Sequence, residues 1–165
     1  IFIGISSQLS ATVQNARLAA EEMGANRIHI VDSLNLSTGI GLLVLKAAEL
    51  RAAGKSVSEI LASLEGLTGK VRTSFAIDTL EYLYLGGRCS AVTNLVGSML
   101  HIRPVIEVRS DGTLGVRDKI RGARVKSLQS MLDSFMNELP NIDLERILTA
   151  FPPDKVNTYY LVKKS

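Results

Sequence analysis

The chain has 165 residues, of which 46% are hydrophobic and 21% are charged, and its formal net charge is +3. This length and composition indicate one folded domain or two small ones, and they exclude an intrinsically disordered chain. The charge is too small to indicate nucleic-acid binding by itself. The longest apolar stretches are far shorter than a membrane span. The single cysteine, Cys89, excludes a disulfide within the chain, and we therefore expect a reducing, cytoplasmic environment.

Strands and helices alternate over the first 70 residues with short links, a pattern typical of βαβ units and a largely parallel sheet. The second helix is strongly apolar, and a capping box formed by Ser56 and Glu59 begins the third. The expected elements are a strand over 1–5, a helix over 11–23, a strand over 27–31, a helix over 37–53 and a helix that Gly66 ends.

The pattern changes near residue 70 to that of an α+β domain. A hairpin is expected around Ser110-Asp111-Gly112, and a last helix is expected to begin at Pro152-Pro153-Asp154. We therefore predict an α/β fold with two domains, residues 1–70 with a parallel sheet and residues 71–165 of the α+β type. The other expected elements are strands over 71–77, 102–108, 113–120 and 146–151, and helices after Asp78, over 91–99 and over 123–139.

A serine cluster, Ser6, Ser7 and Ser10, lies where the first strand leads into the first helix. Hydroxyls at the positive end of a helix can hold a carboxylate or a phosphate together with free backbone N–H groups. Ligands also bind at the carboxyl ends of parallel strands. The alternative is that Ser10 only caps the helix. No glycine-rich phosphate loop is present, so the sequence gives no support for nucleotide binding.

A basic strand is the second candidate. Strict alternation over 113–121 places Arg117, Lys119 and Arg121 on one face. Such a face is either solvated or able to bind an acidic head group, a partner or nucleic acid. Arg88, after Gly86-Gly87, can reach a ligand or simply follow the end of a helix.

The remaining titratable residues indicate no metal site and no catalytic residue. His29 and His101 have no carboxylate at ligand spacing. Asp32 directly follows the second predicted strand, a position that suits catalysis in an α/β fold, but we favour a role in capping the loop.

Several segments together resemble the DegV family, from residue 1 to about residue 130. The resemblance is carried by an ordered set of motifs. These are Ile5–Thr12, Ile30–Ser33, Asp78–Leu83 with Gly86–Arg88, Val96–Pro104, and Asp111-Gly112 with Lys119–Gly122. Ala11 stands where the family usually has glycine, and Cys89 where it usually has isoleucine. An early threonine-bearing loop and a late histidine-glycine segment are absent. We therefore expect the N-terminal part of the first domain and the C-terminal part of the second to be missing.

The resemblance implies a bacterial protein that binds a long-chain fatty acid in a tunnel between two domains and is not itself an enzyme. It implies a separate kinase subunit that phosphorylates the fatty acid carboxylate. Ser7 and Ser10 carry over as the carboxylate ligands, with Ser6 as the alternative, and Arg88 and Arg121 as residues of the pocket opening or the kinase contact. No cofactor or metal is implied. The alternatives are a small-molecule phosphotransferase, and a nucleic-acid-binding module that uses the basic hairpin.

Overall fold

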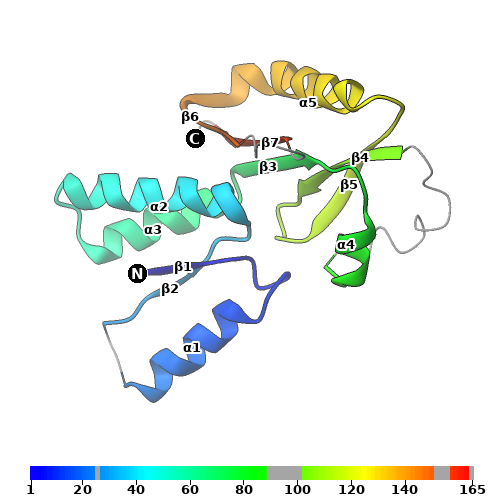
Figure 1. The fold of residues 1–165 in the computed structure, drawn as a ribbon. Coiled ribbons are helices and arrows are strands. Elements are labelled where there is room, and N and C mark those ends of the chain that lie inside the picture. The colour runs from blue at the N-terminus through cyan, green and yellow to red at the C-terminus, as the bar shows by residue number, and fades with distance from the viewer. Residues whose placement is uncertain (25–26, 89–101, 151–156, 164–165) are drawn as a thin grey trace. The chain divides into compact units, whose positions relative to one another are not determined.

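The computed structural model describes residues 1–24, 27–88, 102–150 and 157–163, and the chain forms two compact units. The first unit comprises Ile1–Val71 together with Ser110–Gly112, and the second comprises Arg72–Arg109 and Thr113–Ser165. Each unit has its own sheet, parallel in the first and antiparallel in the second (Figure 1). The predicted α/β fold class is confirmed.

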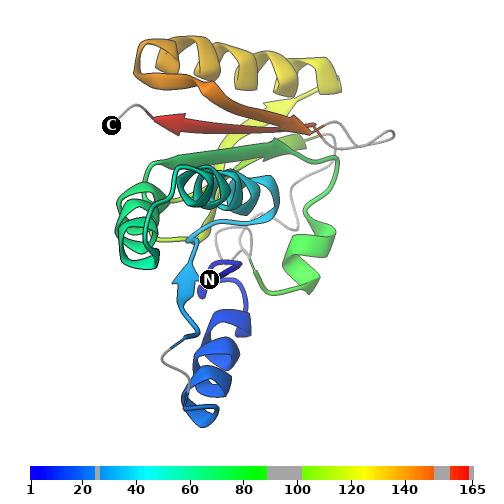
Figure 2. The ribbon, with the colours of Figure 1, turned by 90° about the vertical axis from the view of Figure 1, so that its left-hand side faces the viewer.

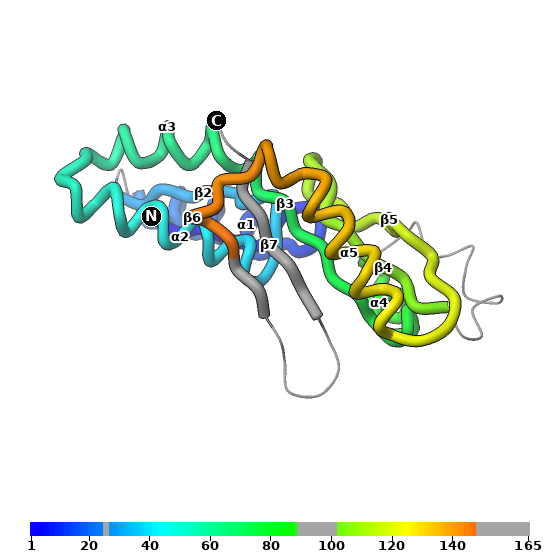
Figure 3. Tube along the Cα trace, turned by 90° about the horizontal axis from the view of Figure 1, so that it is seen from above, coloured from blue at the N-terminus to red at the C-terminus, as the bar shows by residue number. Residues whose placement is uncertain are grey.

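A parallel pair of strands and three helices form the first unit. β1 (Phe2–Gly4) pairs with β2 (Ile30–Asp32), and α1 (Thr12–Glu22) connects them. α2 (Ser37–Ala52) and α3 (Val57–Thr68) lie side by side and antiparallel (Figures 1 and 3). Apolar side chains from all three helices and from β2 are buried, namely Val13, Val31, Leu42, Leu43, Ile60 and Leu64. Their burial supplies the main stabilisation of this unit.

Local sequence determines the junction between α2 and α3. Gly54 has a φ of +76°, and its N–H and that of Lys55 donate to carbonyls in the last turn of α2, which is a Schellman ending. The predicted capping box is confirmed, because Ser56 Oγ accepts from Glu59 N and the Glu59 carboxylate accepts from Ser56 N. Hydrogen bonds from the Lys55 ammonium, and then from Ser56, lower the pKa of the Glu59 carboxyl to about 2.

The second unit is a five-stranded sheet in the order β5-β4-β3-β7-β6, and α5 runs along one face of it (Figure 2). Ala76, Val105 and Met131 form a core cluster between the sheet and α5, and Ile120 packs against it. The elements are β3 (Val71–Ala76), α4 (Glu81–Leu85), β4 (Ile102–Val108), β5 (Leu114–Arg121), α5 (Arg124–Glu138), a 3-10 turn (Leu139–Asn141), β6 (Ile142–Ala150) and β7 (Asn157–Lys163).

A β-bulge interrupts the pairing of β5 with β4. Val116 lies opposite Ile106 and Asp118 lies opposite Val105, so Arg117 has no residue opposite it. A bulge adds one residue to one strand and changes the direction of the side chains that follow. The predicted alternation along β5 is therefore wrong, and Arg117 does not share one exposed face with Lys119 and Arg121.

Several expected elements differ from the structure, and β2 begins at Ile30, three residues later than expected. α3 continues through Gly66 to Thr68, because an isolated glycine lowers helix stability without ending the helix. β6 begins at Ile142, four residues earlier than expected. The predicted last helix is wrong over Asn157–Lys163, where β7 pairs with β6 in the antiparallel sense. The predicted helix over 91–99 lies outside the described residues, as do Cys89 and His101.

Candidate functional site

The two loops that follow β1 and β2 lie at the same edge of the first sheet, because parallel strands end on the same side. The loop after β1 carries the serine cluster and leads into α1, and the loop after β2 leads into α2. A hydrogen bond from Ser6 N to Asn35 O, of 2.8 Å, joins the two loops. This edge therefore brings together two helix N-termini and several hydroxyl groups.

Ser6 is completely buried, and its hydroxyl forms two hydrogen bonds. Ser6 Oγ donates to Gly112 O at 2.8 Å and accepts from Gln8 N at 3.2 Å. Gly112 belongs to the same unit, has a φ of +84°, and lies so close that a Cβ atom there would be 2.2 Å from Ser6 Oγ. These bonds give the Ser6 hydroxyl a structural role in holding the turn of Ser110–Gly112.

Ser7 is exposed, and its backbone N–H points at the Asp32 carboxylate, at 3.2 and 3.3 Å from the two oxygens. Asp32 Oδ1 also accepts from Leu34 N at 3.0 Å. The predicted loop-capping role of Asp32 is confirmed, since its carboxylate binds one amide from each loop. The hydroxyl is therefore the group of Ser7 that faces solvent at this edge.

Ser10 is half-buried and precedes α1. Its Oγ accepts from Thr12 N at 3.2 Å and lies 2.7 Å from Thr12 Oγ1. The N-cap residue of α1 is Ala11, which has no side-chain hydrogen bond. Ser10, the residue before it, accepts from the backbone of the first turn instead. The first turn of α1 contains no acidic residue. The positive end of this helix thus has no carboxylate of its own beside it.

Thr38 is a hydroxyl residue that the sequence analysis did not select. It lies in the first turn of α2, and its Oγ1 is buried without a hydrogen-bond partner among the described residues. The residue before it, Ser37, has a φ of +49°, and Leu34 in the same loop has a φ of +48°. Such conformations are costly for residues other than glycine and concentrate at functional sites. The sequence did contain a signal for Thr38. Ser37-Thr38-Gly39 places hydroxyl residues at the start of a helix that follows a strand, as the serine cluster does for α1.

The two arginines selected from sequence lie in the second unit. Arg88 follows α4, and its Nη1 donates to Gly86 O, which agrees with a role at the helix end. Arg121 is exposed and ends β5, opposite Ile102. Arg103 of β4 forms a more extensive set of bonds, because it pairs with Asp78 and also donates from Nε to Gly122 O at 3.1 Å.

The described ranges hold neither a cluster of metal ligands nor a membrane-spanning helix. No three His, Cys, Asp or Glu side chains there come together in a group that could hold a metal ion. Within the same ranges, no helix is both long enough and apolar enough to cross a lipid bilayer.

Comparison of the sequence with known proteins identifies a family. The profile described as "Uncharacterised protein, DegV family" matches residues 1–150. A DegV domain-containing protein of Clostridium acetobutylicum is 36% identical over 141 residues, which cover 86% of this chain and 50% of that protein. The chain spans about half the length of the curated relatives it matches.

Solved structures are similar as well. A fatty-acid-binding DegV family protein from Thermus thermophilus is 25% identical with a TM-score of 0.78, over 97% of this chain and 69% of its own. The fatty acid kinase (Fak) B3 protein of Streptococcus pneumoniae, loaded with linoleic acid, is 29% identical with a TM-score of 0.71, over 82% of this chain and 49% of its own.

Proposed function

Since this chain belongs to the DegV family, we propose that the protein binds a long-chain fatty acid and holds its carboxylate at the carboxyl edge of β1 and β2. Similar structures that carry fatty acids support the ligand class, with linoleic acid in one and vaccenic acid in another. The protein acts as a carrier in this proposal, and the chemistry on the fatty acid belongs to a partner kinase.

Unused hydroxyls at the edge of the parallel sheet carry the proposal. The Ser7 side chain is exposed, and Thr38 Oγ1 is buried without a partner in the described part of the chain. A buried hydroxyl without a hydrogen bond is costly, and a carboxylate oxygen can accept from it. Ser10 stands beside the N-terminus of α1, whose dipole favours a negative charge. Ser6 serves as a positioning residue for this loop.

The energetics of such a ligand divide between its two ends. Each buried CH2 group of the tail contributes about 0.8 kcal/mol, so the tail supplies most of the affinity. The carboxylate must be hydrogen-bonded, because burial of an unpaired charge is far more costly than that gain. Hydroxyl donors then determine whether the head group can be buried at all.

Oleate binding to the full-length protein tests the role of the hydroxyls. We expect copurified fatty acid in native mass spectra, and a roughly ten- to hundredfold loss of oleate affinity in Ser7→Ala and in Thr38→Val, because each loses a hydrogen bond to a charged group. The exposed Ser58 of α3 is the matched control, and Ser58→Ala should bind oleate like the wild type. Unchanged affinity in both site variants would show that the carboxylate lies elsewhere.

Presentation to a kinase is the second part of the proposal. The neighbour from Streptococcus pneumoniae is named as a fatty acid kinase protein, and Arg88 and Arg121 are cationic residues suited to contact a partner. Acyl phosphate formation with the partner kinase subunit should fall in Arg88→Ala and Arg121→Ala while oleate affinity stays constant. Arg51→Ala, on the exposed side of α2, is the control. Equal rates for all three variants would remove the two arginines from the contact.

A further inference from the structure

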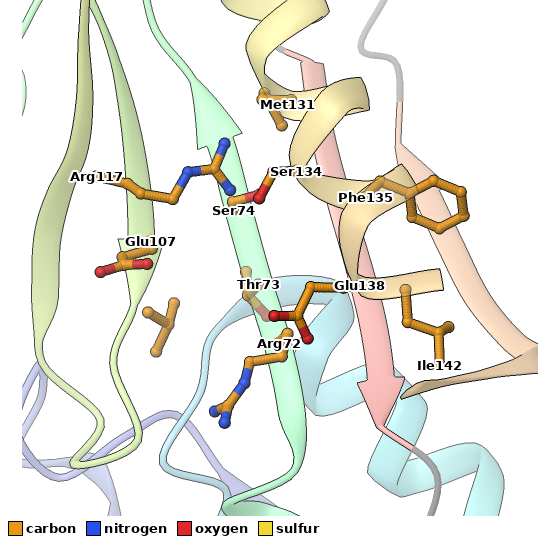
Figure 4. A pocket seen from close by; sticks show the side chains of 11 residues that line it. Arg72, Thr73, Ser74, Glu107, Arg117, Met131, Ser134, Phe135, Glu138 and Ile142 are labelled. Atoms are coloured by element: carbon orange, nitrogen blue, oxygen red, sulfur yellow. The ribbon is translucent and has the colours of Figure 1, made fainter. Parts of the chain in front are cut away.

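A polar pocket of about 230 Å³ lies between α5 and the face of the sheet that α5 covers, entirely within the second unit (Figure 4). Its walls come from β3, β4, β5, α5 and the start of β6. The lining residues are Arg72, Thr73, Ser74, Glu107, Val108, Arg117, Met131, Ser134, Phe135, Glu138 and Ile142. A volume below 300 Å³ suits a ligand smaller than a typical drug molecule.

The sequence of α5 places several polar residues at its interface with the sheet. Ser127 is fully buried and Ser130 is half-buried against the sheet, and Ser134 and Glu138 follow at helical spacing toward the pocket. Met131 of the same helix is also buried, whereas Val125, Leu132 and Met136 are exposed. The side of α5 that faces the sheet therefore carries both polar and apolar residues, and its polar residues Ser134 and Glu138 line the pocket together with Met131 and Phe135.

The β5 bulge places Arg117 in this pocket. Its guanidinium extends toward Ser74 and Ser134 (Figure 4). Arg117 Nε donates to Asp118 Oδ2 at 3.1 Å, and Ser130 Oγ donates to the same oxygen at 2.7 Å, so the Asp118 carboxylate links Arg117 to α5. Arg117 Nη2 is buried, and it has no hydrogen-bond partner among the described residues.

A buried guanidinium N–H that lacks an acceptor is costly, and an oxyanion is the acceptor that suits it best. The pocket is not simply cationic, however, because two arginines and two glutamates line it, namely Arg72, Arg117, Glu107 and Glu138. A ligand with only negative charge would meet the two carboxylates unfavourably. A ligand with one charge of each sign meets an oppositely charged side chain for each of its own groups.

We propose that this pocket binds a small zwitterion, a molecule with a carboxylate and an ammonium group, whose carboxylate accepts from Arg117 Nη2 and whose ammonium group faces Glu107. The hydroxyls of Ser74 and Ser134 lie beside the guanidinium and orient the carboxylate (Figure 4). The site is independent of the fatty acid proposal. An acyl chain requires an apolar pocket, and four charged side chains line this one.

Calorimetric titration of the full-length protein with glycine, β-alanine and 4-aminobutyrate tests the proposal. At least one of these zwitterions should bind, with acetate and methylammonium each at least tenfold weaker. Arg117→Gln and Glu107→Gln should each weaken binding tenfold or more. Arg109→Gln is the matched control, because this exposed arginine belongs to the same hairpin and does not line the pocket.

Three results would overturn the proposal: no binding of any of the three zwitterions, acetate binding as tightly as they do, or equal affinity in the two pocket variants and the wild type. Urea denaturation monitors whether each variant is folded. Should Arg117→Gln fail to fold, Glu107→Gln still decides the outcome, since Glu107 is only half-buried.

Discussion

Replacement of Ser6 by alanine removes a fully buried hydroxyl that forms two hydrogen bonds. The donor bond to Gly112 O and the acceptor bond from Gln8 N measure 2.8 and 3.2 Å. Each such bond contributes about 0.5–1.5 kcal/mol net, so Ser6→Ala should lower the free energy of unfolding by about 1–3 kcal/mol. The neighbouring Ser7→Ala removes an exposed hydroxyl and should change that free energy by less than about 0.5 kcal/mol.

Urea denaturation of the two variants and the wild type measures this contrast. We expect the midpoint of Ser6→Ala to fall at an unchanged slope, and that of Ser7→Ala to stay constant. Oleate titration should give the opposite order of sensitivity, with Ser7→Ala affected directly. Equal stability losses in both variants would refute the assignment of one serine to structure and the other to the ligand.

Three further changes have expected outcomes. Gly112→Ala should destabilise the protein by at least about 1 kcal/mol in urea denaturation, because alanine is strained at a φ of +84° and its Cβ would collide with Ser6 Oγ; a wild-type midpoint would contradict this geometry. The Glu59 carboxyl, with a pKa of about 2 in the folded state against an ordinary value of 4.5, should stabilise the protein above pH 4.5 and lose that contribution as the pH falls toward 2; NMR titration of this carboxyl checks the value, and Lys55→Met should raise it. Leu64→Ala empties a site with no exposed surface and should cost about 2–5 kcal/mol in thermal or urea denaturation, whereas a cost below 1 kcal/mol would show that α3 is loosely packed.

Features encoded by neighbouring residues were predictable from the sequence. The capping box of Ser56 and Glu59 and the glycine ending at Gly54 depend only on residues within one or two turns, and both occur as expected. Asp32 likewise binds the amide of Leu34 two residues on, a local pattern typical of aspartate.

Features that depend on distant partners were not predictable. The bulge at Arg117 arises from the register between β5 and β4, and β7 is a strand because β6 is its partner. Ser6 and Thr38 differ in their hydrogen bonding, because only the folded loops show that Ser6 is bonded while Thr38 Oγ1 has no partner among the described residues. The sequence pattern selected the serine cluster as a whole, and the hydrogen bonds of the folded loops distinguish its members.

The first unit is discontinuous along the chain, because Ser110–Gly112 belongs to it although residues 72–109 do not. The acceptor of the Ser6 hydroxyl is thus synthesised 106 residues after its donor. During translation, the serine loop lacks this acceptor until Gly112 has left the ribosome, and closing so long a loop is slow and entropically unfavourable. A truncated polypeptide of residues 1–71 should therefore be less stable than the same residues in the complete chain, and ligand binding measured on it would underestimate that of the complete protein.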